Sequence, residues 1–310
     1  MIDDCRIIVI TGPTATGKTA LGVQLAKKLD GEVVSADSMQ VYKQMDIGTA
    51  KPTTDEMLGV PHHMLDIAEP WEDYSAARYV SDASKCVDNI LDRGKTAVIV
   101  GGTGLYIDSL LSGHGFSARG DEALRRELEE EFDKIGGEAM LLKLRGFDPV
   151  SAEKLHFNDR KRVVRAIETF ITAGKTISQH DDESKTLPPR FDAKKFALTF
   201  SERAELYRRI DNRADMMVSM GLVDEVRRLL DIGVPPRCTA MQAIGYKEIA
   251  GAILGEWDFS DAVERMKMQS RRYAKRQLSW LRRGTTTTWV TWDRVPDIEC
   301  CVERIIREIR

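Results

Sequence analysis

The sequence predicts an α/β fold in which helices flank a parallel sheet and a helical insertion domain interrupts the chain. Three observations carry this prediction. Short apolar strands alternate with amphipathic helices in the first hundred residues. A glycine-rich loop joins the first strand to the first helix. A highly charged helical stretch with no strand candidate begins near residue 117.

The first half of the chain contains the expected strands and loops. Residues 6–11 form an apolar run that is typical of a buried strand, the glycine-rich loop covers 12–19, and an amphipathic helix is expected from Ala20 to about Leu29. Further buried strands are expected at 32–35 and 96–100. Strands connected by helices in this order indicate a parallel sheet.

The pattern changes in the second half. Residues 121–174 are helical in periodicity, and 196–200 resemble a strand that returns to the sheet. The chain after this strand is mostly helical, and residues 284–310 show an apolar helical pattern from which we infer no function. We therefore expect a core of 1–116 plus 196–310 and a helical insertion domain of 117–195.

Composition excludes several classes of protein. The 310 residues carry a formal net charge of -3, and the five cysteines show no paired CxxC spacing, so a structural zinc site is not expected. No apolar run reaches the roughly 18 residues that span a bilayer. Free thiols and the lack of a signal peptide favour a cytoplasmic location. We expect no membrane partner and a monomer.

The glycine-rich loop is a phosphate-binding loop, or P-loop. Its sequence, Gly12-Pro13-Thr14-Ala15-Thr16-Gly17-Lys18-Thr19, fits the pattern G-x-x-x-x-G-K-[ST] between a strand and a helix. Backbone amides and the helix N-terminus attract phosphate, Lys18 adds a charge, and Thr19 offers a hydroxyl to Mg²⁺. The fold is therefore expected to be like that of P-loop NTPases.

The loop alone does not identify the phosphate compound. A kinase or an NTPase is the usual assignment, but the chain has no Asn-Lys-x-Asp motif for reading guanine. The apolar strand 96–100 ends in glycines and not in a Walker B aspartate. A P-loop small-molecule kinase and a non-catalytic RNA-binding ATPase remain alternatives at this point.

Asp37 follows the second expected strand. Ligands of open parallel sheets bind beyond the carboxyl ends of the strands, so Asp37 is expected near the P-loop. Its carboxylate could take a proton from an incoming nucleophile. An aspartate that caps a helix or a turn is the alternative.

Residues 265–283 are strongly basic. They contain eight Lys or Arg residues and no acidic residue, with Tyr273 and Trp280 among them. This mixture suits contact with phosphates and stacking on bases, whereas a solvated helix face is the alternative.

Several further motifs resemble one family. The P-loop, residues 37–43, residues 45–52 and residues 100–106 together resemble the tRNA dimethylallyltransferases, also called tRNA isopentenyltransferases, of the bacterial type. Further similar segments follow at 61–67, 158–168, 244–248 and 271–277. Gln44 stands where this family usually has glycine. The resemblance covers roughly residues 6–283.

This resemblance implies a reaction. The family transfers the dimethylallyl group of dimethylallyl diphosphate to N6 of adenosine 37 in tRNA, giving N6-dimethylallyladenosine and diphosphate. The P-loop would then hold the diphosphate of the donor with Mg²⁺ at Thr19. Asp37 resembles the general base, Arg213 the arginine that contacts the diphosphate, and Thr103 a residue at the reacting adenosine.

The resemblance also implies contacts with the tRNA anticodon stem-loop. Gln40 would offer a donor and an acceptor to the edge of the target base. The expected tRNA-binding residues are Asp37, Ser38, Met39, Gln40, Thr103, Arg125, Lys161, Arg162, Val163, Val164, Arg165, Gln242, Ala243, Ile244, Gly245, Tyr246, Lys247, Arg271, Arg272, Lys275 and Arg276.

Overall fold

A six-stranded parallel sheet organises the larger part of the protein. The structure is a computed structural model and describes residues 6–113, 121–186, 188–284 and 286–309. The strands follow the order β3-β2-β4-β1-β5-β6, and every pairing is parallel. Their bounds are β1 Ile7–Thr11, β2 Gly31–Ser35, β3 His62–His63, β4 Thr96–Gly101, β5 Lys194–Phe200 and β6 Thr287–Trp292.

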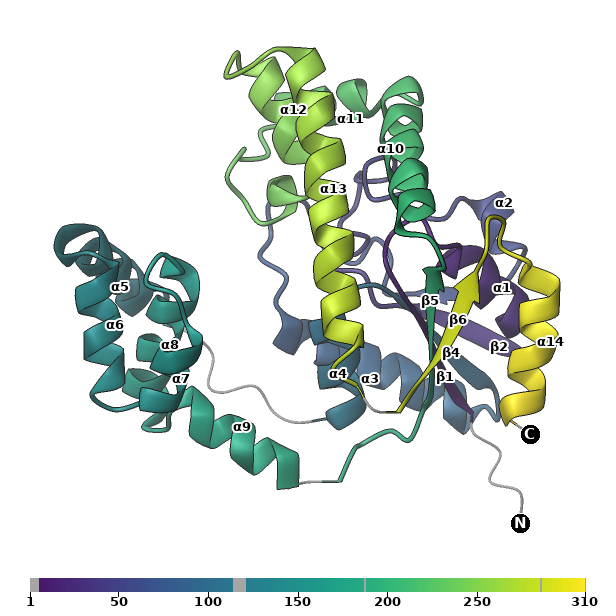
Figure 1. The fold of residues 1–310 in the computed structure, drawn as a ribbon, viewed down its shortest axis with the longest axis horizontal. Coiled ribbons are helices and arrows are strands. Elements are labelled where there is room, and N and C mark those ends of the chain that lie inside the picture. The colour runs from purple at the N-terminus through teal and green to yellow at the C-terminus, as the bar shows by residue number, and fades with distance from the viewer. Residues whose placement is uncertain (1–5, 114–120, 187, 285, 310) are drawn as a thin grey trace. The chain divides into compact units, whose positions relative to one another are not determined.

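Helices cover both faces of this sheet (Figure 1). Neighbouring residues of a strand point to opposite faces, so Val9 belongs to one core and Ile10 to the other. The core around Val9 receives apolar residues of α3, α4, α11 and α12, and the core around Ile10 receives those of α1 and α14. The helix bounds are α1 Lys18–Lys28, α2 Thr54–Met57, α3 Ala76–Asp92, α4 Gly104–Ser112, α10 Arg203–Ser219, α11 Leu222–Asp231, α12 Tyr246–Ile253, α13 Phe259–Leu281 and α14 Ile298–Ile309, with a 3₁₀ turn at Ala240–Gln242.

The predicted fold class is confirmed, and its strands at β1, β2, β4 and β5 are found within two residues of their expected positions. Two edge strands were not predicted. β3 has only two residues, which is too short to show a periodicity. β6 has the composition of a strand, with four β-branched residues and two tryptophans.

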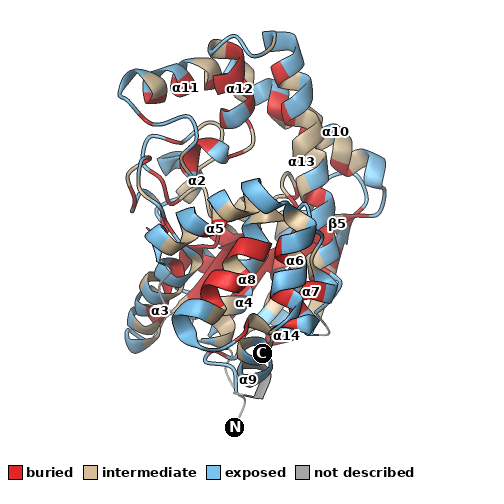
Figure 2. Ribbon diagram, turned by 90° about the vertical axis from the view of Figure 1, so that its left-hand side faces the viewer, coloured by how far each residue is buried: buried red, intermediate tan, exposed pale blue. Residues whose placement is uncertain are grey.

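Residues 112–190 form a compact unit of their own. Its helices are α5 Glu122–Ile135, α6 Gly137–Arg145, α7 Pro149–Lys154, α8 Arg160–Ala173 and α9 Ile177–Thr186. They enclose a separate small core that includes Leu128, Met140 and Ile167, and buried residues run along α8 (Figure 2). The expected boundary at residue 117 falls within 114–120, which lie outside the described residues.

The helices of the described ranges were compared with the requirements for spanning a membrane. None of these helices combines the length and the apolar character that crossing a bilayer requires.

Candidate active site at the carboxyl edge of the sheet

Three loops meet at the carboxyl edge of the sheet. They follow the adjacent strands β2, β4 and β1, and they carry Asp37, Thr103 and the P-loop. The amide of Thr103 donates a hydrogen bond to the carbonyl of Ala36 at 3.1 Å. A Cβ atom on Gly101 would lie 2.2 Å from that same carbonyl oxygen, so only glycine permits this approach.

The P-loop has the backbone of a phosphate cradle. Gly12 and Gly17 have φ angles of 145° and 87°, which favour glycine, and α1 begins immediately at Lys18. Inside the loop, the hydroxyl of Thr16 donates to the carbonyl of Pro13 at 2.8 Å, and the ammonium of Lys18 donates to the same carbonyl at 2.7 Å. Two side chains of the loop therefore hold its conformation by hydrogen bonds to one of its own carbonyl groups.

Two side chains from distant parts of the chain support the P-loop. Arg209 of α10 donates from Nε to the carbonyl of Ala15 at 3.2 Å. Trp292 of β6 donates from Nε1 to the carbonyl of Thr16 at 3.0 Å. Sequence reasoning missed both, because nothing local to either residue points to the loop. The C-terminal segment, which had no expected role, thus stabilises the phosphate site.

Lys18, Asp37 and Arg213 come together although they belong to three separate elements. Burial, and to a smaller extent the guanidinium of Arg213, lower the pKa of Lys18 to about 7, and the carboxylate of Asp37 opposes both effects. Burial also lowers the pKa of Arg213, and Asp37 again opposes the shift. Two half-buried basic groups beside one carboxylate leave a positive site that an anion would stabilise.

Thr103 links Asp37's loop to α13. Its hydroxyl oxygen accepts a hydrogen bond from the amide of Ser38 at 3.0 Å. It also interacts with the hydroxyl of Tyr273, whose pKa is raised to about 12 by burial and by the charge of Asp37. The amide of Met39 donates to Oδ1 of Asp37 at 2.9 Å, so this carboxylate caps a turn while it faces the two cations. Tyr273 stays a neutral phenol at physiological pH.

Tyr273 and Gln277 are polar residues of α13; the sequence suggested only base stacking for Tyr273 and no role for Gln277. They stand four residues apart, hence on one face of the helix. Gln277 is buried among apolar positions such as Ala274 and Leu278. Polar residues in a buried helical stripe are the signal that could have identified them.

Gln40 uses its amide within the protein. Oε1 accepts from the hydroxyl of Ser35 at 3.1 Å, and Nε2 donates to the carbonyls of Thr49 and Ala50, each at 3.2 Å. Reading a base edge would require these bonds to be exchanged, so the expected role of Gln40 stays a prediction. Gln44, the departure from the family pattern, has a φ of 62°, a conformation that explains why glycine is usual there.

The segment 242–247 is buried in its middle and exposed at its two ends. Gln242 and Lys247 are exposed, whereas Tyr246 is fully buried and donates its hydroxyl to Glu225. Ala243 and Gly245 are also buried, and Ile244 is half-buried. The side chain of Tyr246 therefore belongs to the core in this structure.

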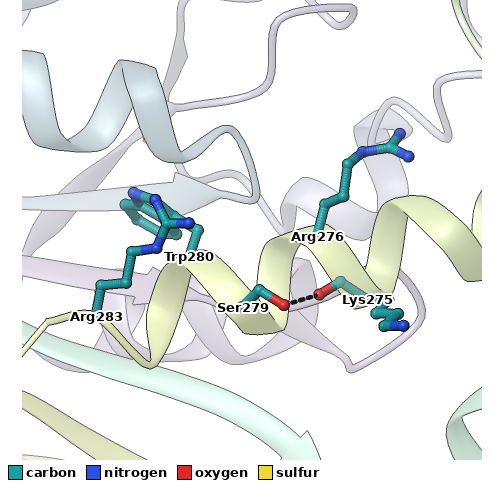
Figure 3. Close-up of a pocket in the computed structure, with 5 residues that line it drawn as sticks. All are labelled: Lys275, Arg276, Ser279, Trp280 and Arg283. Carbon is teal, nitrogen blue, oxygen red and sulfur yellow. Dashed lines mark hydrogen bonds between the residues drawn. The ribbon is translucent and has the colours of Figure 1, made fainter. Parts of the chain in front are cut away.

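Helix α13 presents only some of its basic residues to solvent. Lys267 pairs with Asp215 at 2.8 Å, and Arg271 pairs with Asp211, so α10 neutralises this side of the helix. Arg272, Lys275 and Arg276 are exposed. A pocket of about 310 Å³ is lined by Lys275, Arg276, Ser279, Trp280 and Arg283 (Figure 3).

The expected tRNA-binding residues of the insertion unit also divide by exposure. Lys161 and Arg162 are exposed on α8, whereas Val163 and Val164 are buried in the unit's own core. Arg125 and Arg165 both pair with the buried carboxylate of Glu168, at 3.1 Å and 2.8 Å. The buried valines thus hold the helix in place, and the exposed cations remain the predicted RNA contacts.

Comparisons with known proteins test the assignment. Residues 40–284 match the family model for IPP transferase. The chain is 44% identical over 301 residues to a tRNA dimethylallyltransferase of Acetivibrio thermocellus, covering 97% of this chain and 96% of that relative. A tRNA isopentenylpyrophosphate transferase of Bacillus halodurans matches in structure with a TM-score of 0.73 and 40% identity, over 98% of this chain and 96% of the other.

A more distant structure agrees with these two. A eukaryotic dimethylallyltransferase acting on tRNA has a TM-score of 0.82 and 30% identity, covering 97% of this chain and 78% of that one. The relatives named here are all prenyltransferases, so a small-molecule kinase is not favoured. The predicted family is confirmed: the chain belongs to the IPP transferase family.

Proposed function

We propose that the protein transfers the dimethylallyl group of dimethylallyl diphosphate to N6 of adenosine 37 in tRNA. The single observation that carries this proposal is the grouping of Lys18, Arg213 and Asp37 at the carboxyl edge of the sheet. Two cations beside an anion-binding loop suit a departing diphosphate, and a carboxylate next to them suits the removal of a proton.

The diphosphate end of the donor fits the P-loop. The amides of the loop and the N-terminus of α1 favour a compact anion, and Lys18 and Arg213 add charge at the same place. As the bond between C1 of the dimethylallyl group and the diphosphate oxygen breaks, negative charge grows on that oxygen. Positive groups that are already in position stabilise this charge without reorganisation.

A magnesium ion fits this donor set. The described residues contain no group of three or more His, Cys, Asp or Glu side chains that could hold a metal, and Mg²⁺ needs few protein ligands when phosphate oxygens supply the rest. Thr19, in the first turn of α1, would be its protein ligand. When bound, Mg²⁺ neutralises charge on the diphosphate.

Asp37 is the proposed general base. The C1–N6 bond forms while the C1–O bond breaks, and the N6 proton passes to the Asp37 carboxylate, so the charges balance. The hydrogen bond from the Met39 amide holds the carboxylate in place. Thr103, held by the Ser38 amide and Tyr273, is proposed to contact the reacting adenosine. General-base catalysis typically contributes about 10²- to 10⁴-fold in rate.

The exposed cations of α13 and of residues 161–162 are the proposed tRNA contacts, together with Gln242 and Lys247. An extruded base costs a few kcal/mol of stacking energy, and this cost is least in a single-stranded loop such as the anticodon loop. Monomeric state and cytoplasmic location stay predictions.

Incubation with radiolabelled dimethylallyl diphosphate, Mg²⁺ and an anticodon stem-loop with three consecutive adenosines tests the proposal. Label is expected in the RNA, and it is expected to disappear when the target adenosine is replaced by a base without an N6 amine. Label transfer that requires ATP, or no transfer at all, would reject the proposed function.

A further inference from the structure

Gln277 bridges the P-loop and the glycine turn that follows β4. Its Oε1 accepts a hydrogen bond from the amide of Thr14 at 3.2 Å. Its Nε2 donates to the carbonyl of Gly102 at 2.9 Å. Gln277 is 6% exposed, so its amide is largely shielded from water, and losing a hydrogen-bond partner there is costly.

The glycine turn is shaped to receive α13. A Cβ atom on Gly102 would lie 2.2 Å from Nε2 of Gln277, and a Cβ atom on Gly104 would lie 2.4 Å from the ring of Trp280. Gln277 and Trp280 are three residues apart and therefore lie on one side of α13. These glycines thus serve the close approach of a helix, which places the Gln277 amide between two loops of the active site.

A neutral amide is suited to this position. The Thr14 amide belongs to the loop that must point its N–H groups at an anion. An acceptor behind the loop fixes the peptide's orientation in the absence of ligand, and preorganised donors bind more tightly because less ordering is needed on binding. A carboxylate in the same place would also accept this bond, but it would repel the anion.

We propose that Gln277 is a positioning residue for the diphosphate. Its amide links the Thr14 peptide of the P-loop to the Gly102 carbonyl and so holds the loop in the conformation that binds the anion. The inference rests on the proposed function to the extent that the anion is a diphosphate.

Calorimetric titration of the whole protein with inorganic diphosphate and Mg²⁺ tests this inference, using Gln277→Leu and Gln277→Glu. Leucine has a similar size and no polar atoms, and we expect it to weaken binding by roughly tenfold, the usual effect of leaving a buried partner unbonded. Glutamate keeps the acceptor and adds a charge. We expect it to weaken binding more at low salt, with a loss that shrinks between ~50 mM and ~500 mM salt because screening increases.

Gln269→Leu is the matched control, because Gln269 lies about two turns earlier on the same helix and its side chain makes no hydrogen bond to either loop among the described residues. It is expected to bind diphosphate as the wild type does. Thermal unfolding of each variant is measured in parallel, and the glutamate variant's salt dependence is a signature that partial unfolding would not produce.

Equal diphosphate affinity in the wild type and both Gln277 variants would overturn the inference, as would an equal loss in Gln277→Leu and Gln269→Leu. The titration needs neither RNA nor a prenyl donor. Failure of the inference is therefore distinguishable from failure of the proposed transfer reaction, which the label assay reports separately.

Discussion

Arg213 lies close enough to Lys18 to lower the pKa of the lysine, adding to the larger effect of burial. The two residues come from α10 and from the start of α1. Like charges at short range oppose each other, and the cost is relieved when an anion arrives. The two side chains therefore form a positive site that a bound phosphate group would stabilise.

The first prediction follows from the pKa of about 7 at Lys18. Below pH 7 the lysine is already charged, so diphosphate binding takes up no proton there. Above pH 7 the diphosphate must bind together with a proton, so its affinity falls by up to about tenfold per pH unit until the pKa of the complex is reached.

Diphosphate itself titrates in this range, so Lys18→Arg serves as the reference because arginine stays charged. Calorimetric titrations with Mg²⁺-diphosphate between pH 6 and pH 9, in steps of ~0.5 pH units, give the ratio of the dissociation constants of the wild type and of Lys18→Arg. The wild-type constant should rise relative to that of the variant above pH 7. A ratio that does not change with pH would show that Lys18 is fully charged in the free protein.

The second prediction concerns the exposed side of α13. Arg272→Gln and Arg276→Gln should each weaken binding of an anticodon stem-loop and reduce the slope of log affinity against log salt by about 0.7, the value for one phosphate contact to a single strand. Fluorescence anisotropy at several salt concentrations measures both quantities.

Lys267→Gln is the control on the same helix, because its ammonium already pairs with Asp215 and Glu264. Its salt slope should match that of the wild type. If Lys267→Gln reduced the slope as much as Arg272→Gln, the pairing with α10 would not separate the two sides of the helix.

The third prediction separates core from surface in the segment 242–247. Glu225 is buried and accepts hydrogen bonds from the amides of Asp46, Ile47 and Gly48 as well as from Tyr246. Tyr246→Phe removes the hydroxyl group of the tyrosine, so the Glu225 carboxylate loses one of its hydrogen bonds. It should lower the free energy of unfolding by about 1–2 kcal/mol and leave RNA affinity unchanged.

Lys247→Gln should leave the free energy of unfolding unchanged and weaken RNA binding, because Lys247 is exposed. Urea unfolding and RNA titration of both variants give a double comparison. Weaker RNA binding by Tyr246→Phe at unchanged stability would assign the tyrosine to the RNA surface.

Features that depend on neighbouring residues could be predicted from the sequence, whereas contacts between residues far apart in the chain could not. The P-loop and Asp37 were predictable because a strand end fixes the position of the residues that follow it. Arg213 was reached only through the family resemblance, since its approach to Lys18 depends on how α10 packs. Trp292 and Gln277 support the P-loop from 276 and 263 residues away in the chain, and no local pattern encodes such a contact.

Exposure was the other quantity that the sequence did not provide. Val163 and Tyr246 lie in segments that resemble tRNA-contacting motifs, yet both side chains are buried. A motif records which residues occur together, and some of them occur because they hold the others in place. Hydrophobic periodicity along α8 is the feature that separates Val163 and Val164 from the exposed Lys161 and Arg162.

Asp37→Asn gives the most direct test of the central claim, that a carboxylate beside two cations removes the N6 proton while the diphosphate leaves. Asparagine keeps the oxygen that accepts from the Met39 amide, so the turn is retained and only the base is lost. Single-turnover transfer of labelled dimethylallyl to an anticodon stem-loop should slow by about 10²- to 10⁴-fold, with RNA affinity changed little. A transfer rate equal to that of the wild type, at equal RNA binding, would contradict the account.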